Sequence, residues 1–217
     1  MQEVFGGIQA ALVQHRQTAR IYFAPHSKFP GDLLAQNFRG LHLIRDPRDV
    51  VLSGLHYHKK SGEKWLHVRS EEYRGLTYQQ KLNSLDPDDQ IVLEMQRTAR
   101  AAVREMTEWH YDDPRFFEAR YEDLIEDASG EKFGRILAFL GLRGSVAVQG
   151  VAVFRQVSLF PGKPIPQNHS HIRSGRSGQW RTDFRRRHGE RFVEILGDCL
   201  IRLGYEPDND WVRRLPA

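Results

Sequence analysis

The sequence predicts an α/β fold in which a parallel sheet is flanked by helices. Short apolar runs typical of buried strands lie at residues 20–25, 41–44 and 115–124. Longer amphipathic runs alternate with them, and this alternation favours parallel strands that are covered by helices on both faces. The chain has 217 residues, of which 40% are hydrophobic, so it is long enough for one domain with a sizeable core. We therefore expect residues 1–217 to form a single domain.

The helices are predicted from apolar side chains that recur every three or four residues. They are expected at residues 2–16, 46–60, 88–111, 129–142 and 188–203. Residues 61–90 are polar and interrupted by glycine and proline, so loops and short helices are expected there. Residues 144–170 contain three prolines and are expected to be loop-like.

Charge is distributed unevenly along the chain. Lys plus Arg exceeds Asp plus Glu by 32 − 28 = 4 overall, but residues 173–191 hold seven arginines against two acids, a surplus of 7 − 2 = 5. This pattern favours a local anion site over a globally basic surface. The single cysteine, Cys199, cannot form an internal disulfide or a cysteine-based metal site. With no signal peptide and no apolar run of roughly 20 residues, a cytoplasmic protein is expected.

Residues 43–60, LIRDPRDVVLSGLHYHKK, place an arginine where a strand ends and a helix begins. Asp46 is expected to cap the helix, with Pro47 at its first position and Asp49 completing an acidic cap. Capping does not account for Arg45, nor for Ser53 two turns into the helix. These two side chains could converge on one phosphate, because ligands bind at the carboxyl ends of parallel strands. The alternative is that Arg45 is a surface residue paired with Asp49.

This segment resembles the 3′-phosphate-binding segment of the cytosolic-type sulfotransferases, which use 3′-phosphoadenosine 5′-phosphosulfate (PAPS). In that family an arginine and a serine eight residues later grip the 3′-phosphate, and here 53 − 45 = 8. The resemblance implies that Arg45 and Ser53 bind the nucleotide, and that the fold is the P-loop NTPase-like fold of sulfotransferases.

Two further segments follow in the order that the family has them. RYEDLIEDASGEKFGRILAFLGL, from Arg120, resembles the family's Y-E-D-L strand and helix, which implies that Tyr121 lies near the adenine. IRSGRSGQWRTDF, from Ile172, resembles the late R-K-G-x-x-G-x-W loop, which implies that Arg173, Ser174 and Gly175 complete the 3′-phosphate and adenosine site. Ser174 stands where the family has lysine, and Arg176 can replace the lost charge.

The catalytic base that the resemblance implies is His26. The stretch YFAPHSKFPGDLL is similar to the family's K-T-H-x-P segment, although Ala24 stands in place of the lysine. An imidazole with an ordinary pKa near 6.5 can accept a proton at neutral pH. The alternative is an exposed loop histidine with no catalytic role. His56 and His58 are interpreted as packing or surface residues, and the transfer requires no metal.

Nothing in the sequence resembles the family's P-K/R-S-G-T-T loop, which holds the 5′-phosphosulfate. The first strand and loop are therefore expected to be missing, so that the chain is either an N-terminally truncated member or a divergent one. Binding of the desulfated product PAP is a safer expectation than turnover. The expected function is sulfuryl transfer from PAPS to a hydroxyl or amine of a small-molecule or glycan acceptor. An inactive PAP-binding remnant is the main alternative. An anion- or nucleic-acid-binding protein that uses residues 173–191 is a weaker one, and nucleic acid is not an expected partner.

Overall fold

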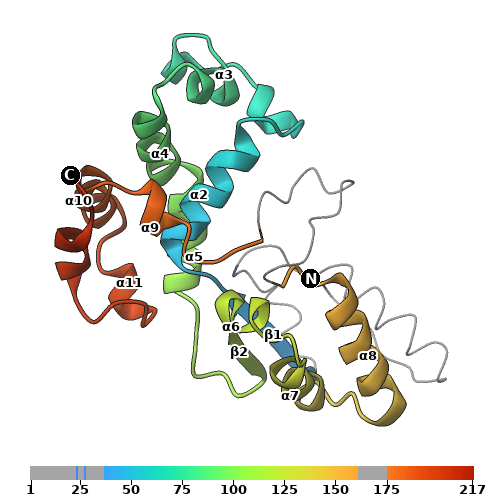
Figure 1. Cartoon of the computed structure of the whole chain (residues 1–217). Coiled ribbons are helices and arrows are strands. Elements are labelled where there is room, and N and C mark those ends of the chain that lie inside the picture. Colours follow the sequence, from blue (N-terminus) through green and yellow to red (C-terminus); the bar gives the residue numbers. More distant parts are fainter. Residues whose placement is uncertain (1–22, 24–26, 28–36, 161–174) are drawn as a thin grey trace. The chain divides into compact units, whose positions relative to one another are not determined.

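The structure is a computed structural model that describes Phe23, Ser27 and residues 37–160 and 175–217 (Figure 1). It contains a small parallel sheet and many helices, which confirms the predicted α/β class. The chain divides into two compact units. The first takes its described residues from Met1–Arg45 and Trp109–Ser177, and the second from Asp46–Glu108 and Gly178–Ala217. The single domain expected for residues 1–217 stays a prediction.

The first unit is built on two parallel strands, β1 (Gly40–Ile44) and β2 (Phe116–Arg120). They pair in register from Gly40 opposite Phe116 to Ile44 opposite Arg120. The strand predicted at 115–124 is too long, because the chain turns into helix α6 (Tyr121–Ile125) directly after Arg120. Two acidic residues in the first turn of α6 favour this early helix start.

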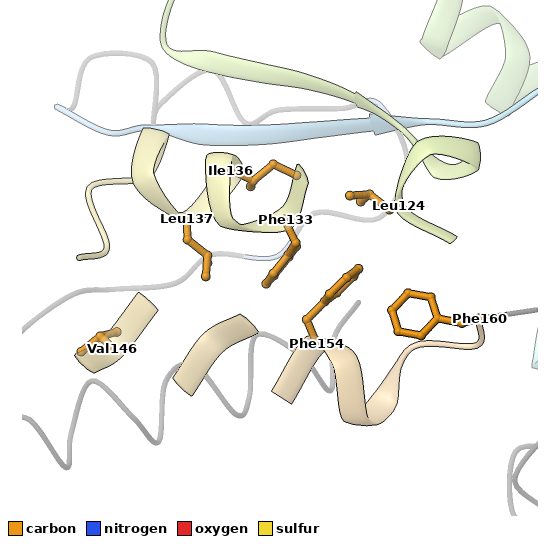
Figure 2. Packing of buried hydrophobic residues seen from close by; sticks show 7 residues of the cluster. All are labelled: Leu124, Phe133, Ile136, Leu137, Val146, Phe154 and Phe160. Carbon is orange, nitrogen blue, oxygen red and sulfur yellow. The ribbon is translucent and has the colours of Figure 1, made fainter. Parts of the chain in front are cut away.

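Two longer helices, α7 (Glu131–Phe139) and α8 (Gly144–Val157), cover one face of this sheet. Figure 2 shows the core between them, where the rings of Phe133 and Phe154 stack with centroids 4.2 Å apart. The buried members are Leu124, Phe133, Ile136, Leu137, Val146, Phe154 and Phe160, and Leu41, Leu43, Phe117 and Ala119 of the strands pack against them.

The loop-like interpretation of 144–170 is wrong for α8. Val146, Gly150 and Phe154 recur every four residues on its buried side, and all three prolines of the stretch follow this helix. The strand expected at 20–25 lies outside the described residues except for Phe23, and so does the helix expected at 2–16.

The second unit is helical. It contains α2 (Pro47–His58), α3 (Tyr78–Asn83), α4 (Pro87–Gln96), α5 (Thr98–Thr107), α9 (Trp180–Asp183), α10 (Arg186–Leu196) and α11 (Cys199–Arg202). Short 3-10 turns lie at η2 (Lys64–His67), η3 (Glu71–Tyr73) and η4 (Asn209–Arg214). The helix predicted at 46–60 is therefore present as α2, and the short helices predicted within 61–90 are present as well.

Two predicted long helices are each interrupted. The expected helix 88–111 breaks at Arg97, whose φ of −114° and ψ of −96° are not helical, and it becomes α4 and α5. The expected helix 188–203 breaks at Gly197, which has a φ of +64° that favours glycine, and it becomes α10 and α11. Among the described residues, no helix has both the length and the apolar character needed to cross a membrane.

Candidate functional site

The candidate site lies in the first unit, where β1 and β2 end at the same edge of the sheet. Ile44 is opposite Arg120, so the residues that follow them, Arg45 and Tyr121, leave the sheet side by side. The Arg45 guanidinium carbon lies 4.6 Å from the centroid of the Tyr121 ring. This is a cation–π contact, which holds the guanidinium over the aromatic face. The carboxyl ends of parallel strands are where ligands bind in α/β folds.

Both side chains also bind the segment that begins at Gly175. The Tyr121 hydroxyl donates a hydrogen bond to the Gly175 carbonyl at 2.7 Å. Arg45 Nη2 donates to the carbonyl of Arg176 at 3.1 Å. An arginine, an aromatic ring and a glycine backbone, which come from three distant parts of the sequence, therefore meet within this unit.

Gly175 is required by its conformation and by its neighbour. Its φ is +62°, and a Cβ atom added to it would lie 2.7 Å from Cβ of Leu159. A larger residue would have to displace this segment or the Leu159 backbone. Glycine at this position therefore lets the segment pack closely against Leu159 while its carbonyl accepts the hydrogen bond from Tyr121.

In the second unit, the start of α2 forms as its sequence predicts. The Asp46 carboxylate accepts a hydrogen bond from the Arg48 backbone N–H at 2.9 Å, and Pro47 occupies the first helical position. Ser53 lies in the second turn of α2 and is exposed, so its hydroxyl is available to a ligand. Its partnership with Arg45 on one phosphate stays a prediction.

Asp49 has a role that capping did not suggest. Its carboxylate is buried and accepts hydrogen bonds from the backbone N–H groups of Gly178 at 2.6 Å and Trp180 at 3.1 Å. It therefore fixes the start of α9 against α2. The glycine and tryptophan that the family resemblance singled out thus contribute to the frame of this loop.

Sequence reasoning missed Arg48 altogether. Only 1% of its surface is exposed, and its guanidinium donates to both oxygens of Asp46, at 2.9 and 2.7 Å, and to Glu206 at 2.6 Å. The guanidinium carbon lies 3.5 Å from the ring centroid of Trp180 and 4.8 Å from that of Trp211. A charged residue in the first turn of a helix ordinarily points to solvent, so no sequence signal indicated this buried ion pair.

A second buried carboxylate, Glu94 of α4, organises the other end of α2. It accepts hydrogen bonds from the Tyr78 hydroxyl at 2.8 Å and from Thr98, and it pairs with His58 Nδ1 at 3.0 Å. Burial has the largest effect in raising the pKa of Tyr78, and the neighbouring Glu94 carboxylate raises it further. Tyr78 is therefore a neutral donor here, and His58 is engaged in packing, as the sequence suggested.

The remaining predicted site residues are His26, Arg173 and Ser174, and all three lie outside the described residues. Arg45, Tyr121 and Gly175 are the predicted residues that the structure brings together. Arg176, expected to replace a lost lysine charge, contributes its carbonyl to Arg45, while its side chain is exposed. Within the described part of the chain, no group of three or more His, Cys, Asp and Glu side chains could hold a metal ion.

Comparison with known proteins identifies the family of the chain. A model of the sulfotransferase domain family matches residues 7–204, which is most of the chain. A search of curated proteins gave no match.

Proposed function

Because the chain belongs to the sulfotransferase family, we propose that it transfers a sulfuryl group from PAPS to a hydroxyl or amine of a small-molecule or glycan acceptor. The observation that carries the proposal is the contact of Arg45 with Tyr121 and of both with the segment at Gly175. A cation beside an aromatic face provides the groups needed to bind the phosphate and the base of a phosphorylated adenosine.

In this proposal, Arg45 and Ser53 bind the 3′-phosphate, Tyr121 lies beside the adenine, and Arg173, Ser174 and Gly175 complete the nucleotide site. The residues fit such a ligand, because the Arg45 guanidinium lies over the Tyr121 ring and so places a cation beside an aromatic face. His26 accepts the proton of the acceptor hydroxyl or amine. When bound, the nucleotide supplies the activated sulfuryl group.

The arginine-rich stretch 173–191 is less suited to binding nucleic acid than its composition suggests, which favours the nucleotide-site proposal. Arg187 Nη2 lies 3.8, 3.0 and 3.6 Å from carboxylate oxygens of Asp86, Asp88 and Asp89, and Arg191 pairs with Glu194. These carboxylates neutralise part of the positive charge that would be needed to bind the phosphate backbone of a nucleic acid.

The first test is a calorimetric titration with PAP, with adenosine 5′-phosphate, with ATP and with a short oligonucleotide. PAP should bind roughly 10- to 100-fold more tightly than adenosine 5′-phosphate, since charge-assisted hydrogen bonds to the 3′-phosphate contribute about 1.5–3 kcal/mol. No preference for the 3′-phosphorylated nucleotide would contradict the proposal. Tighter binding of the oligonucleotide would favour residues 173–191 as a nucleic-acid surface.

Substitution Arg45→Ala should weaken PAP binding by roughly 10- to 100-fold, to about the affinity of adenosine 5′-phosphate. The matched control is Arg213→Ala, because Arg213 is an exposed arginine whose partner is Asp210 at 3.5 Å. If Arg45→Ala binds PAP like the parent protein while both variants remain folded by circular dichroism, the assignment of Arg45 is wrong.

Substitution Tyr121→Phe separates the ring from the hydroxyl. The ring would still face Arg45, but the hydrogen bond to the Gly175 carbonyl would be lost. A neutral hydrogen bond contributes about 1 kcal/mol, so PAP affinity should fall roughly fivefold. Tyr121→Ala, which removes the ring as well, should weaken binding further; equal affinities for the two variants would show that the ring has no role.

A transfer assay with PAPS and a panel of phenols, sterols and sugars then tests turnover. Formation of PAP together with a sulfated acceptor supports the enzyme. Tight PAP binding with no transfer to any acceptor would favour the alternative of a nucleotide-binding protein without activity.

A further inference from the structure

The sheet of the first unit has a second face that the core does not use. Leu41 and Leu43 point into the core, and because side chains alternate along a strand, His42 between them points to the opposite face. Its partner in the sheet register is Glu118. A histidine and a carboxylate therefore stand opposite each other on adjacent strands.

Both nitrogens of the His42 ring have a partner. Nδ1 lies 2.5 Å from Oε2 of Glu118, and Nε2 lies 2.8 Å from Oγ of Ser27. An ionised carboxylate only accepts hydrogen bonds, so Nδ1 of the neutral ring carries the proton and donates it to Glu118. Nε2 is then the acceptor, and the Ser27 hydroxyl donates its proton to Nε2.

The ring and the carboxylate are held in place by aromatic neighbours. Trp109 stacks on the His42 ring, with centroids 4.1 Å apart and planes 18° apart, and its Nε1 donates to Oε1 of Glu118 at 2.9 Å. Tyr111 contacts the ring by its edge. His42 is only 6% exposed, whereas Ser27 is half-buried, so the hydroxyl lies on the more accessible side of the imidazole.

We propose that Ser27, His42 and Glu118 form a nucleophile, base and acid triad that hydrolyses carboxylic esters. A hydroxyl that donates to an imidazole, which in turn donates to a carboxylate, is the arrangement that activates serine as a nucleophile. Ser27 and His42 act as catalytic residues, and Glu118 is a positioning residue that fixes the tautomer of His42. This activity is separate from the sulfuryl transfer proposed above.

The reaction has two balanced steps. In the first, the Ser27 oxygen attacks the ester carbonyl, its proton moves to His42 Nε2 and then to the leaving alkoxide, and an alcohol departs. In the second, water attacks the acyl-serine, its proton passes through His42 to the serine oxygen, and a carboxylic acid departs. Ser27 is regenerated, and one ester and one water give one acid and one alcohol.

The first experiment exposes the full chain to a fluorophosphonate probe and locates the adduct by peptide mass spectrometry. Attack by Ser27 forms an oxygen–phosphorus bond and releases fluoride, while His42 takes the proton. Ser27 should be labelled at least 100-fold faster than the exposed Ser84, because a general base contributes roughly 10²–10⁴-fold. Equal rates at the two serines would overturn the proposal, and this comparison needs no variant.

Variants then distinguish a catalytic role of Ser27 and His42 from a hydrogen bond that is only structural. Ser27→Ala should remove the fast labelling, Ser84→Ala should leave it unchanged, and His42→Gln should slow labelling of Ser27 by at least 100-fold. Glu118→Asp should recover part of the rate lost in Glu118→Ala. Fast labelling of Ser27 in His42→Gln would overturn the proposal.

Hydrolysis of p-nitrophenyl acetate gives the second readout. The parent protein should release up to one nitrophenol per chain in an initial burst as Ser27 is acylated, and Ser27→Ala should show no burst. Absence of a burst and of steady hydrolysis in the parent protein would overturn the ester activity. PAP binding by Ser27→Ala should remain intact, which keeps this result distinct from the test of sulfuryl transfer.

Discussion

Arg48 is the residue whose environment departs most from what its position in the sequence suggests. Its charge is buried between two carboxylates, Asp46 and Glu206, and between two tryptophan rings. Glu206 also accepts a hydrogen bond from Arg214 at 2.7 Å. The network joins the first turn of α2 to α9 and to the C-terminal segment of the second unit, so its role is to stabilise that unit.

Substitution Arg48→Ala should lower the free energy of unfolding by about 3–5 kcal/mol, because removal of one partner leaves buried carboxylates uncompensated. Arg213→Ala is the control: its side chain is 83% exposed, and an exposed ion pair contributes about 0–1 kcal/mol. Urea unfolding followed by circular dichroism measures both. A loss below 1 kcal/mol for Arg48→Ala would mean that the network contributes little to stability.

At the level of single residues, the sequence indicated those whose hydrogen-bond partners lie close along the chain. It also indicated those that belong to a motif with distinctive spacing. Asp46 was identified as a cap because its partner, the Arg48 N–H, is two residues away. Arg45 was singled out because capping could not explain it. The contact of Tyr121 with Gly175 spans 54 residues, and that of His42 with Glu118 spans 76. The family resemblance named both residues of the first contact, whereas nothing in the sequence pointed to the second.

Among the elements, α2 and α4 approach each other closely at a glycine. A Cβ atom added to Gly54 would lie 2.6 Å from Oε1 of Glu94, the buried carboxylate that binds Tyr78 and His58. Glycine costs a helix interior roughly 0.5–1 kcal/mol relative to alanine. At position 54 this cost is offset by the contact that the absent side chain permits.

Substitution Gly54→Ala should therefore destabilise the protein by about 1–3 kcal/mol, the usual cost of overpacking, although alanine is the better helix former. The matched control is Gly134→Ala in α7. An added Cβ there would meet only Val151 Cγ2 at 3.8 Å, so stability should rise by up to about 1 kcal/mol. Thermal unfolding should give shifts of opposite sign; a stabilised Gly54→Ala would show that Glu94 can move at little cost.

The errors in the predicted elements arise where local sequence signals and the folded structure disagree. The apolar pattern of 88–111 continues through Arg97, where the backbone leaves the helical region, so periodicity alone joined α4 to α5. The prolines after Phe160 favoured a loop over 144–170, whereas α8 is a helix that is buried against α7 through Val146 and Phe154. Periodicity identified most helices, but it did not locate the breaks, because local backbone conformation and tertiary packing decide them.

The whole chain has a net charge of +4, but this number does not show which charged side chains are paired with each other. The arginine-rich start of α10 faces the aspartates at the start of α4, and His188 lies among these charges. Its Nδ1 accepts a hydrogen bond from the Arg185 backbone N–H at 2.9 Å, and its Nε2 lies 3.4 Å from Oδ1 of Asp88. The pKa of His188 is lowered from 6.5 to about 4. Burial has the largest effect, and the positive charges of Arg187 and Arg185 add to it, whereas the negative charge of Asp89 opposes it.

Stability should therefore fall as the pH falls from about 6.5 to about 4. In that window the unfolded chain binds a proton at His188 and the folded chain does not, so protonation favours unfolding, by at most roughly 3 kcal/mol at the acid end. His188→Asn retains an acceptor for the Arg185 N–H but does not titrate. Urea unfolding of both proteins at pH 7.5 and pH 5 should show that the parent protein loses about 2 kcal/mol more than the variant. Equal losses would mean that His188 titrates alike in the folded and unfolded chains.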